Sequence, residues 1–294
     1  MPKDIEGLVL KRIGGFHYVQ TELGQIYECS IRGKAKEQGI VVGDRVMIKE
    51  TEADRGVVER ILPRSVELIR PAVANVDQVL LVMSYNRPQP SLKLLDRLLV
   101  QIEYHHLSAV IVLNKCDLAS CEIIEQIDKG YPDIGYPVIH ASAKKGRGVD
   151  DILTEMQGKI SVLSGPSGVG KSSLLNTLIP ETNMRTQEVS EKIGRGRHTT
   201  RHAELFPLPM GGWIADTPGF STVDTPSIKR EQLADLFVEF ERYSNNCRFK
   251  DCLHNKEAHC GVRQAVEKGQ IMASRHQSYL TLLEEVIQSE RWYK

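Results

Sequence analysis

A glycine-rich segment, residues 165–172, has the residue types and spacing of a phosphate-binding loop. Its sequence, GPSGVGKS, fits the pattern G-x-x-x-x-G-K-[ST] and lies between an apolar strand, KISVLSG, and a helix that begins LLNTLI. Gly168 and Gly170 let backbone N–H groups turn toward phosphate oxygens at a helix N-terminus, where the helix dipole also favours anions. Lys171 adds a positive charge for the terminal phosphates, and Ser172 offers a hydroxyl ligand to Mg²⁺. The expected phosphate contacts are Gly165, Pro166, Ser167, Gly168, Val169, Gly170, Lys171, Ser172 and Ser173.

A phosphate-binding loop serves ATPases, kinases and GTPases alike, so a second motif must select the base. Residues 114–117, NKCD, resemble the N-K-x-D motif of GTPases and follow the apolar strand SAVIVLN. The carboxylate of Asp117 can accept hydrogen bonds from N1–H and the exocyclic amine of guanine, a donor pair that adenine lacks. We expect Lys115 to pack along the base and Asn114 to tie this loop to the phosphate-binding loop. A later segment, ASAK, resembles the S-A-K segment that contacts guanine O6, and it contributes Ser142, Ala143 and Lys144.

Two further segments occupy the positions of nucleotide switches. Residues 216–219, DTPG, follow the strand GWIA and look like the D-x-x-G motif. In that motif Asp216 would hold Mg²⁺ through water, and Gly219 would sense the γ-phosphate. Between this motif and the phosphate-binding loop lies GRGRHTTR, in which either Thr199 or Thr200 is expected to close over the metal.

The order of these motifs is unusual. In ordinary GTPases the phosphate-binding loop comes first and N-K-x-D and S-A-K come last, whereas here N-K-x-D and S-A-K precede it. A fold depends on which strands are neighbours, so new termini at a surface loop can leave such a site intact. The order therefore predicts a circularly permuted nucleotide-binding domain.

A cluster of metal-binding residue types lies near the C-terminus. Cys247, Cys252, His254 and Cys260 have the spacing C-x4-C-x-H-x5-C. Three thiolates and one imidazole complete a tetrahedral Zn²⁺ site and leave no open position for water, which favours a structural role over a catalytic one. His259 is a nearby competitor for the histidine position.

The elements that must position these residues fall into three predicted domains. Residues 1–70 contain short β segments broken by glycine, which favour a small β-barrel such as an OB-fold, although a spacer domain without a ligand fits the same pattern. Residues 71–225 alternate buried strands with amphipathic helices, as in an α/β P-loop domain with a parallel sheet. Residues 226–294 are predicted to form a helical domain around the metal cluster.

Composition narrows the function classes. The chain of 294 residues is 41% hydrophobic and 26% charged, which excludes a disordered or fibrous protein. Lys plus Arg and Asp plus Glu both number 38, so any contact with nucleic acid would have to be local. We found no signal peptide or membrane span and therefore expect a cytoplasmic protein with no membrane partner. With no self-complementary apolar seam, we expect a monomer.

Together the motifs resemble the circularly permuted GTPase family called ribosome small-subunit-dependent GTPase A, over essentially the full length of the chain. The resemblance implies an N-terminal OB-fold, a permuted GTPase domain and a C-terminal zinc domain. It also implies GTP hydrolysis in late maturation of the small (30S) ribosomal subunit, with rRNA and the subunit as partners and the subunit as stimulator. It favours His254 over His259 as the zinc ligand.

The motifs above do not include the group that orients the attacking water. Ras-like enzymes carry a water-orienting glutamine directly after D-x-x-G, and Phe220 stands there in this chain. An apolar ring cannot orient water, so we expect slow intrinsic hydrolysis and assign His198 as the catalytic group, in agreement with the family resemblance. A loop histidine that contacts RNA, or nothing, is the ordinary alternative.

Two other function classes stay open on the sequence. The first is an RNA-binding assembly factor in which GTP only orders the fold and turnover is incidental, and Phe220 keeps it open. The second is a P-loop kinase for a small molecule, which Asp117 and the metal cluster disfavour.

Overall fold

The computed structural model describes residues 4–32, 38–69, 72–179, 203–216 and 228–292. Contacts divide the chain into two compact units. Unit 1 comprises residues 1–80, 141–164 and 170–221, and unit 2 comprises residues 81–140, 165–169 and 222–294. Among the described residues, no helix combines the length and the apolar character needed to cross a membrane.

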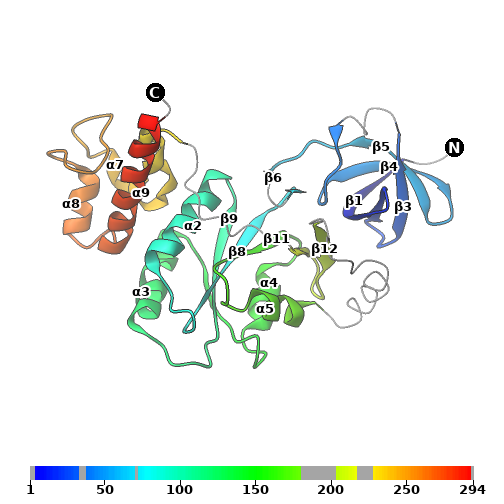
Figure 1. Cartoon of the computed structure of the whole chain (residues 1–294), viewed down its shortest axis with the longest axis horizontal. Helices are drawn as coiled ribbons and strands as arrows, with labels where there is room; N and C mark the ends of the chain where they lie inside the picture. The colour runs from blue at the N-terminus through cyan, green and yellow to red at the C-terminus, as the bar shows by residue number, and fades with distance from the viewer. Residues whose placement is uncertain (1–3, 33–37, 70–71, 180–202, 217–227, 293–294) are drawn as a thin grey trace. The chain divides into compact units, whose positions relative to one another are not determined.

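Unit 1 begins with the predicted β-barrel, which is confirmed (Figure 1). Its strands close in the order β1-β2-β3-β5-β4, with β3 and β5 parallel and the other described pairs antiparallel. Alternate side chains point inward, as the period of two residues predicts, so that Val9, Val19, Val46, Ile48 and Val58 are fully buried. The strands are β1 (Asp4–Ile13), β2 (Phe16–Thr21), β3 (Ile26–Ile31), β4 (Arg45–Glu52) and β5 (Arg55–Ile61).

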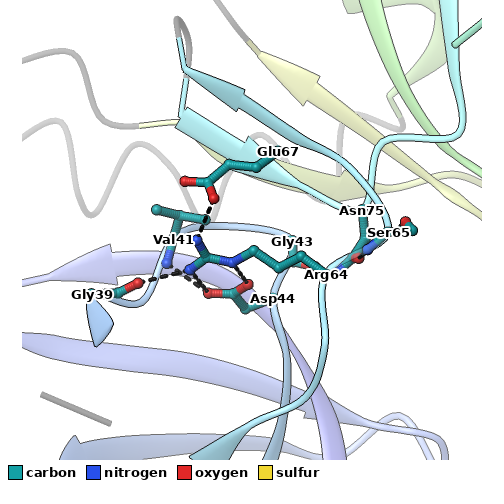
Figure 2. A network of polar contacts seen from close by, with 8 residues as sticks. All are labelled: Gly39, Val41, Gly43, Asp44, Arg64, Ser65, Glu67 and Asn75. Carbon is teal, nitrogen blue, oxygen red and sulfur yellow. Dashed lines mark hydrogen bonds and ion pairs between the residues drawn. The ribbon is translucent and has the colours of Figure 1, made fainter. Parts of the chain in front are cut away.

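A network of charged hydrogen bonds fixes the chain where it leaves the barrel (Figure 2). The carboxylate of Asp44 is fully buried and accepts from Val41 N at 2.9 Å and from Arg64 Nε at 2.7 Å. The Arg64 guanidinium also donates to Gly39 O at 2.7 Å and to Glu67 Oε2 at 2.6 Å. The exit from the barrel is therefore held by a buried carboxylate and its arginine.

The next two strands pair with each other across the predicted domain boundary. Strands β6 (Glu67–Ile69) and β7 (Ala72–Ala74) form an antiparallel pair of their own. The predicted boundary at residues 70 and 71 falls between them. The described residues on either side of this boundary are paired in strands and do not form an extended linker. The three domain limits remain predictions.

The α/β architecture is confirmed by a six-stranded sheet with the order β10-β9-β8-β11-β13-β12. Strand β10 is parallel to β9 and β11 is parallel to β13, whereas β12 is antiparallel to β13. Strands β8 and β11 are buried along their whole length, as expected of parallel strands covered on both faces. The strands are β8 (Gln78–Ser84), β9 (Ser108–Asn114), β10 (Val138–His140), β11 (Ile160–Ser164), β12 (Glu204–Pro207) and β13 (Trp213–Asp216). The helices that follow these strands are α2 (Leu92–Tyr104), α3 (Glu122–Gly130), α4 (Val149–Glu155) and α5 (Lys171–Leu178), and a short 3-10 turn, η1 (Pro132–Ile134), precedes β10.

The C-terminal part of unit 2 is helical, as predicted. Its first segment forms 3-10 turns that place Leu233, Phe237 and Phe240 in one buried cluster with Tyr279. The elements are η2 (Arg230–Leu236), η3 (Val238–Phe240), α7 (Glu241–Ser244), α8 (Gly261–Glu267) and α9 (Ala273–Trp292). Helices α7, α8 and α9 lie together in Figure 1.

Within unit 2, a buried arginine joins α9 to α2. Arg275 has no exposed surface and donates to both carboxylate oxygens of Glu239, at 2.8 and 2.9 Å, and to Asp96 at 3.0 Å. The hydroxyl of Tyr131 donates to the same Asp96 oxygen at 2.6 Å. Burial by itself lowers the pKa of Arg275, but the two carboxylates outweigh it and raise the pKa well above its ordinary value. The helical region is therefore tied to α2 by a buried ion pair.

Candidate nucleotide and metal sites

The phosphate-binding loop lies between β11 and α5, and its glycines are required by the backbone. Gly165 has φ +134°, and a Cβ there would lie 2.1 Å from Val82 O. Gly168 and Gly170 have φ +80° and +99°, in the left-handed region that other residues rarely adopt. The predicted glycine roles therefore rest on close approach at one position and on backbone conformation at the other two.

Helix α5 starts at Lys171, so the lysine and the serines after it stand in its first turn. Partial burial lowers the pKa of the Lys171 ammonium, a cost that a bound phosphate would offset. The side chains of Ser172 and Ser173 are exposed. Ser172 lies in the first turn of α5 and Asp216 is the last residue of β13, and their roles as Mg²⁺ ligands remain predictions.

The N-K-x-D loop is bonded directly to the phosphate-binding loop within unit 2. Asn114 is 2% exposed, and its Nδ2 donates to Val169 O at 2.9 Å. Lys115 Nζ donates to Gly168 O at 2.7 Å and also to the carbonyl oxygen of Arg87. Asp117 is exposed. Two side chains of the N-K-x-D motif thus hold the predicted phosphate-binding loop.

The segment after β10 forms a tight turn in unit 1. Ser142 is buried, and its N–H donates to Arg147 O at 3.0 Å while Arg147 N–H donates to Ser142 O at 3.2 Å. Ala143 O accepts from Thr177 Oγ1 on α5 at 3.4 Å. Lys144 is exposed. This turn is consequently held against the helix that begins at Lys171.

Four of the predicted switch residues cannot be placed. His198, Thr199, Thr200 and Gly219 lie outside the described residues. Their catalytic and magnesium-binding roles remain predictions from the sequence.

The predicted metal ligands converge. The ligand atoms of Cys247, Cys252, His254 and Cys260 all lie within 4.8 Å of one another. Cys247 Sγ is 3.9 Å from Cys260 Sγ and 3.6 Å from His254 Nδ1, and His254 Nδ1 is 3.3 Å from Cys260 Sγ. Tetrahedral Zn²⁺ with ordinary bond lengths requires ligand separations of about 3.5–3.8 Å. The four residues therefore fit a metal ion, and the exposed His259 is not part of the cluster.

A carboxylate that is not one of the four predicted metal ligands also shapes the loop that carries them. Glu257 accepts from the backbone N–H groups of Leu253, Asn255 and Lys256 at 2.9, 2.8 and 3.0 Å. Burial raises the pKa of Glu257, but these hydrogen bonds outweigh it and the pKa is lowered overall. The loop is thus shaped by one carboxylate as well as by its metal ligands.

Sequence reasoning missed a group of side chains beside the base-reading loop. In unit 2 the Tyr85 hydroxyl is hydrogen-bonded to His140, and the other ring nitrogen of His140 lies 3.1 Å from Asp128 Oδ1. His140 directly precedes the ASAK segment, which is the one sequence signal that could have drawn attention to it.

Comparison with known proteins gives a consistent result. The family model described as RsgA GTPase matches residues 61–226, and the RsgA N-terminal domain matches residues 6–58. The small ribosomal subunit biogenesis GTPase RsgA of Moorella thermoacetica is 49% identical over 98% of this chain and 99% of its own, and that of Carboxydothermus hydrogenoformans is 48% identical with the same coverage. The crystal structure of YjeQ from Thermotoga maritima superposes with a TM-score of 0.85 at 36% identity, covering 97% of this chain and 99% of YjeQ. YloQ, a circularly permuted GTPase, gives the same TM-score at 34% identity, covering 98% of this chain and 96% of its own.

Proposed function

The chain belongs to the RsgA GTPase family, and from that premise we propose that it hydrolyses GTP as a molecular switch in late maturation of the small ribosomal subunit. The relatives that match it over nearly their whole length are named for small-subunit biogenesis. Its partners are GTP, GDP, and the small subunit with its rRNA, and the subunit stimulates turnover. The protein works as a cytoplasmic monomer with no membrane partner.

One observation carries the nucleotide assignment. Asn114 and Lys115 donate to Val169 O and Gly168 O, which joins the base-reading motif to the phosphate-binding loop. A nucleotide whose phosphates lie in that loop would have its base near Asp117. Guanine offers two adjacent donors to a carboxylate and adenine does not, so the site selects guanine.

The chemical step is assigned from the motifs and the family. His198 orients the attacking water, because Phe220 cannot. Mg²⁺, when bound with GTP, neutralises charge that develops on the phosphates. Ser172, Asp216 and one of Thr199 and Thr200 supply its protein contacts, and Gly219 senses the γ-phosphate.

The metal in the C-terminal cluster is structural Zn²⁺. Three thiols and an imidazole satisfy four tetrahedral positions and leave none open for a water. The ion holds the loop between α7 and α8, which has few buried apolar side chains of its own. The N-terminal barrel and the C-terminal metal-binding region bind the rRNA.

Base selection tests the proposal directly. Wild-type protein should bind GDP in strong preference to ADP. Asp117→Asn replaces an acceptor by an amide that can donate to the 2-oxygen of xanthine, so its preference should move from guanosine to xanthosine nucleotides. Calorimetric binding of GDP, XDP and ADP to both proteins measures this, and equal affinity of the wild type for ADP and GDP would refute the assignment.

A further inference from the structure

Three side chains outside the nucleotide motifs, Tyr85, His140 and Asp128, form a chain of polar contacts. Tyr85 follows β8, His140 ends β10, and Asp128 lies on α3. Tyr85 Oη is 2.6 Å from His140 Nδ1, and His140 Nε2 is 3.1 Å from Asp128 Oδ1. The Tyr85 and His140 rings meet edge to face, with centroids 5.8 Å apart and an interplanar angle of 66°. All three residues belong to unit 2.

The donor and acceptor atoms of these three side chains follow one order. A carboxylate only accepts hydrogen bonds, so the tautomer that suits these contacts carries a proton on His140 Nε2, which faces Asp128. Nδ1 of that tautomer accepts from the Tyr85 hydroxyl. Asp128 therefore orients His140, and His140 in turn orients Tyr85.

Two of the three residues, Tyr85 and His140, lie next to segments that are predicted to read the base. Tyr85 N–H donates to Asn114 O at 2.9 Å, and Asn114 is the first residue of the NKCD motif. On the other side, His140 is followed directly by the buried Ala141 and Ser142, which begin the turn of the ASAK segment. The three side chains thus link the residue that starts one guanine-recognition segment to the residue that precedes the other.

We propose that Tyr85, His140 and Asp128 are positioning residues for guanine recognition, which hold the NKCD loop in place. This inference rests on the proposed function. Tyr85 touches Asn114 through the backbone, so a freed Tyr85 ring would let the loop that carries Asp117 shift. Asp117 reads the 2-amino group of guanine, so that shift reduces the preference for guanine over a base without that amine.

A purely stabilising role makes a different prediction. If the three side chains only support the fold, a variant that loses their contacts has a lower free energy of unfolding. Its ratio of affinities for two nucleotides stays at the wild-type value. Inosine diphosphate differs from GDP only by the missing 2-amino group. The GDP-to-IDP affinity ratio therefore separates positioning from general stability.

The experiment uses the full-length, metal-loaded protein and three variants. Tyr85→Phe keeps the ring and removes the hydroxyl. His140→Asn keeps an acceptor near the Nδ1 position and so retains the bond from Tyr85, whereas His140→Gln keeps a donor near the Nε2 position and loses that bond. We expect Tyr85→Phe and His140→Gln to weaken GDP binding about threefold to tenfold, the range for one lost hydrogen bond, and to lower the GDP-to-IDP ratio. We expect His140→Asn, which keeps the bond from Tyr85 but loses the contact with Asp128, to fall between the wild type and His140→Gln.

A matched control is His106→Asn. His106 is an exposed histidine of the same unit with φ +54°, a conformation that asparagine tolerates. It should leave both affinities unchanged. Melting temperatures of all variants show whether each is folded at the assay temperature.

Two results would overturn the proposal, and they are distinguishable. If the wild type prefers GDP over ADP and IDP but Tyr85→Phe keeps the wild-type GDP-to-IDP ratio, the contacts among Tyr85, His140 and Asp128 only support the fold, and this inference alone fails. If the wild type does not prefer guanine at all, the proposed function fails and takes this inference with it.

Discussion

Among single residues, the choice between two neighbouring histidines defines the metal site. His254 is buried with its Nδ1 3.3 Å from Cys260 Sγ, whereas His259 is exposed. We expect His254→Ala to reduce bound zinc from one ion per chain to nearly none, because a tetrahedral site loses a quarter of its ligands. Metal content after dialysis, measured by atomic emission, tests this.

The control for that measurement is His259→Asn, which suits the φ of +59° at this position. It should keep a full complement of zinc. Equal zinc loss from both variants would contradict the assignment of His254.

A second residue, His17, should make the barrel sensitive to acid. His17 is 1% exposed, and neither ring nitrogen has a hydrogen-bond partner among the described residues. Burial lowers its pKa, the Arg12 charge lowers it further, and Asp44 partly opposes the shift. Since the folded pKa lies below the unfolded value of about 6.5, the unfolded chain binds more protons in acid. Stability is complete above that value and declines as pH falls toward the folded pKa.

We therefore predict that barrel stability falls between pH 7.5 and 5.5 in the wild type and falls less in His17→Leu, which cannot titrate. Hydrogen-exchange protection factors of amides in β2 and β3 report on the barrel separately from the metal site. An identical loss of protection in both proteins would show that other groups cause the acid sensitivity.

Between elements, the tie of α9 to α2 rests on two arginines in different environments. Arg275 is fully buried between Asp96 and Glu239. We expect Arg275→Met to cost about 3–5 kcal/mol of unfolding free energy, because two carboxylates stay buried without their cation. Arg275→Lys should fall between that variant and the wild type, since it keeps the charge but loses the two-pronged contact.

The matched control joins the same two helices. Arg97 on α2 pairs with Glu285 on α9, and their side chains are 19% and 39% exposed. Arg97→Met should cost at most about 1 kcal/mol, as is typical of solvent-exposed pairs. Urea unfolding of the zinc-loaded variants measures both changes, and equal losses would mean that burial does not set the strength of this tie.

Some helices and strands could be predicted from the sequence, and others could not. Strands with a clear pattern, such as β2 and β8, were predictable because their side chains alternate or are almost uniformly apolar. The pair β6–β7 was not, since three residues carry no measurable period. The 3-10 form of residues 230–240 was also missed, because 3-10 and α-helices both place residues three apart on one side.

Likewise, some residues of the candidate site could be predicted from the sequence and others could not. Motif residues such as Asn114 and Lys171 were predictable because nucleotide chemistry restricts their types and spacing. The Tyr85–His140 bond joins residues 55 apart in sequence, and the Arg275–Asp96 pair joins residues 179 apart. No local pattern marks such pairs, so only a structure identifies them.

For the whole molecule, the permuted order of motifs has a simple consequence. In the sheet order β10-β9-β8-β11-β13-β12, the strands β8, β9 and β10, which come first in the chain, precede β11. Strand β13, which ends at the first residue of the predicted D-x-x-G motif, follows β11 in that order. The chain thus runs from the D-x-x-G motif directly into the metal-binding region. This connection suits a switch whose state is read by a partner bound to the C-terminal region.

The central claim is that the small ribosomal subunit stimulates GTP hydrolysis through His198. The most direct measurement is steady-state phosphate release by the zinc-loaded protein, alone, with purified small subunits, and with large subunits as a control. We predict stimulation of about 100-fold or more by small subunits only, the scale contributed by a positioned general base, lost in His198→Ala and kept in His202→Ala. No stimulation by either subunit, or full stimulation of His198→Ala, would contradict the account.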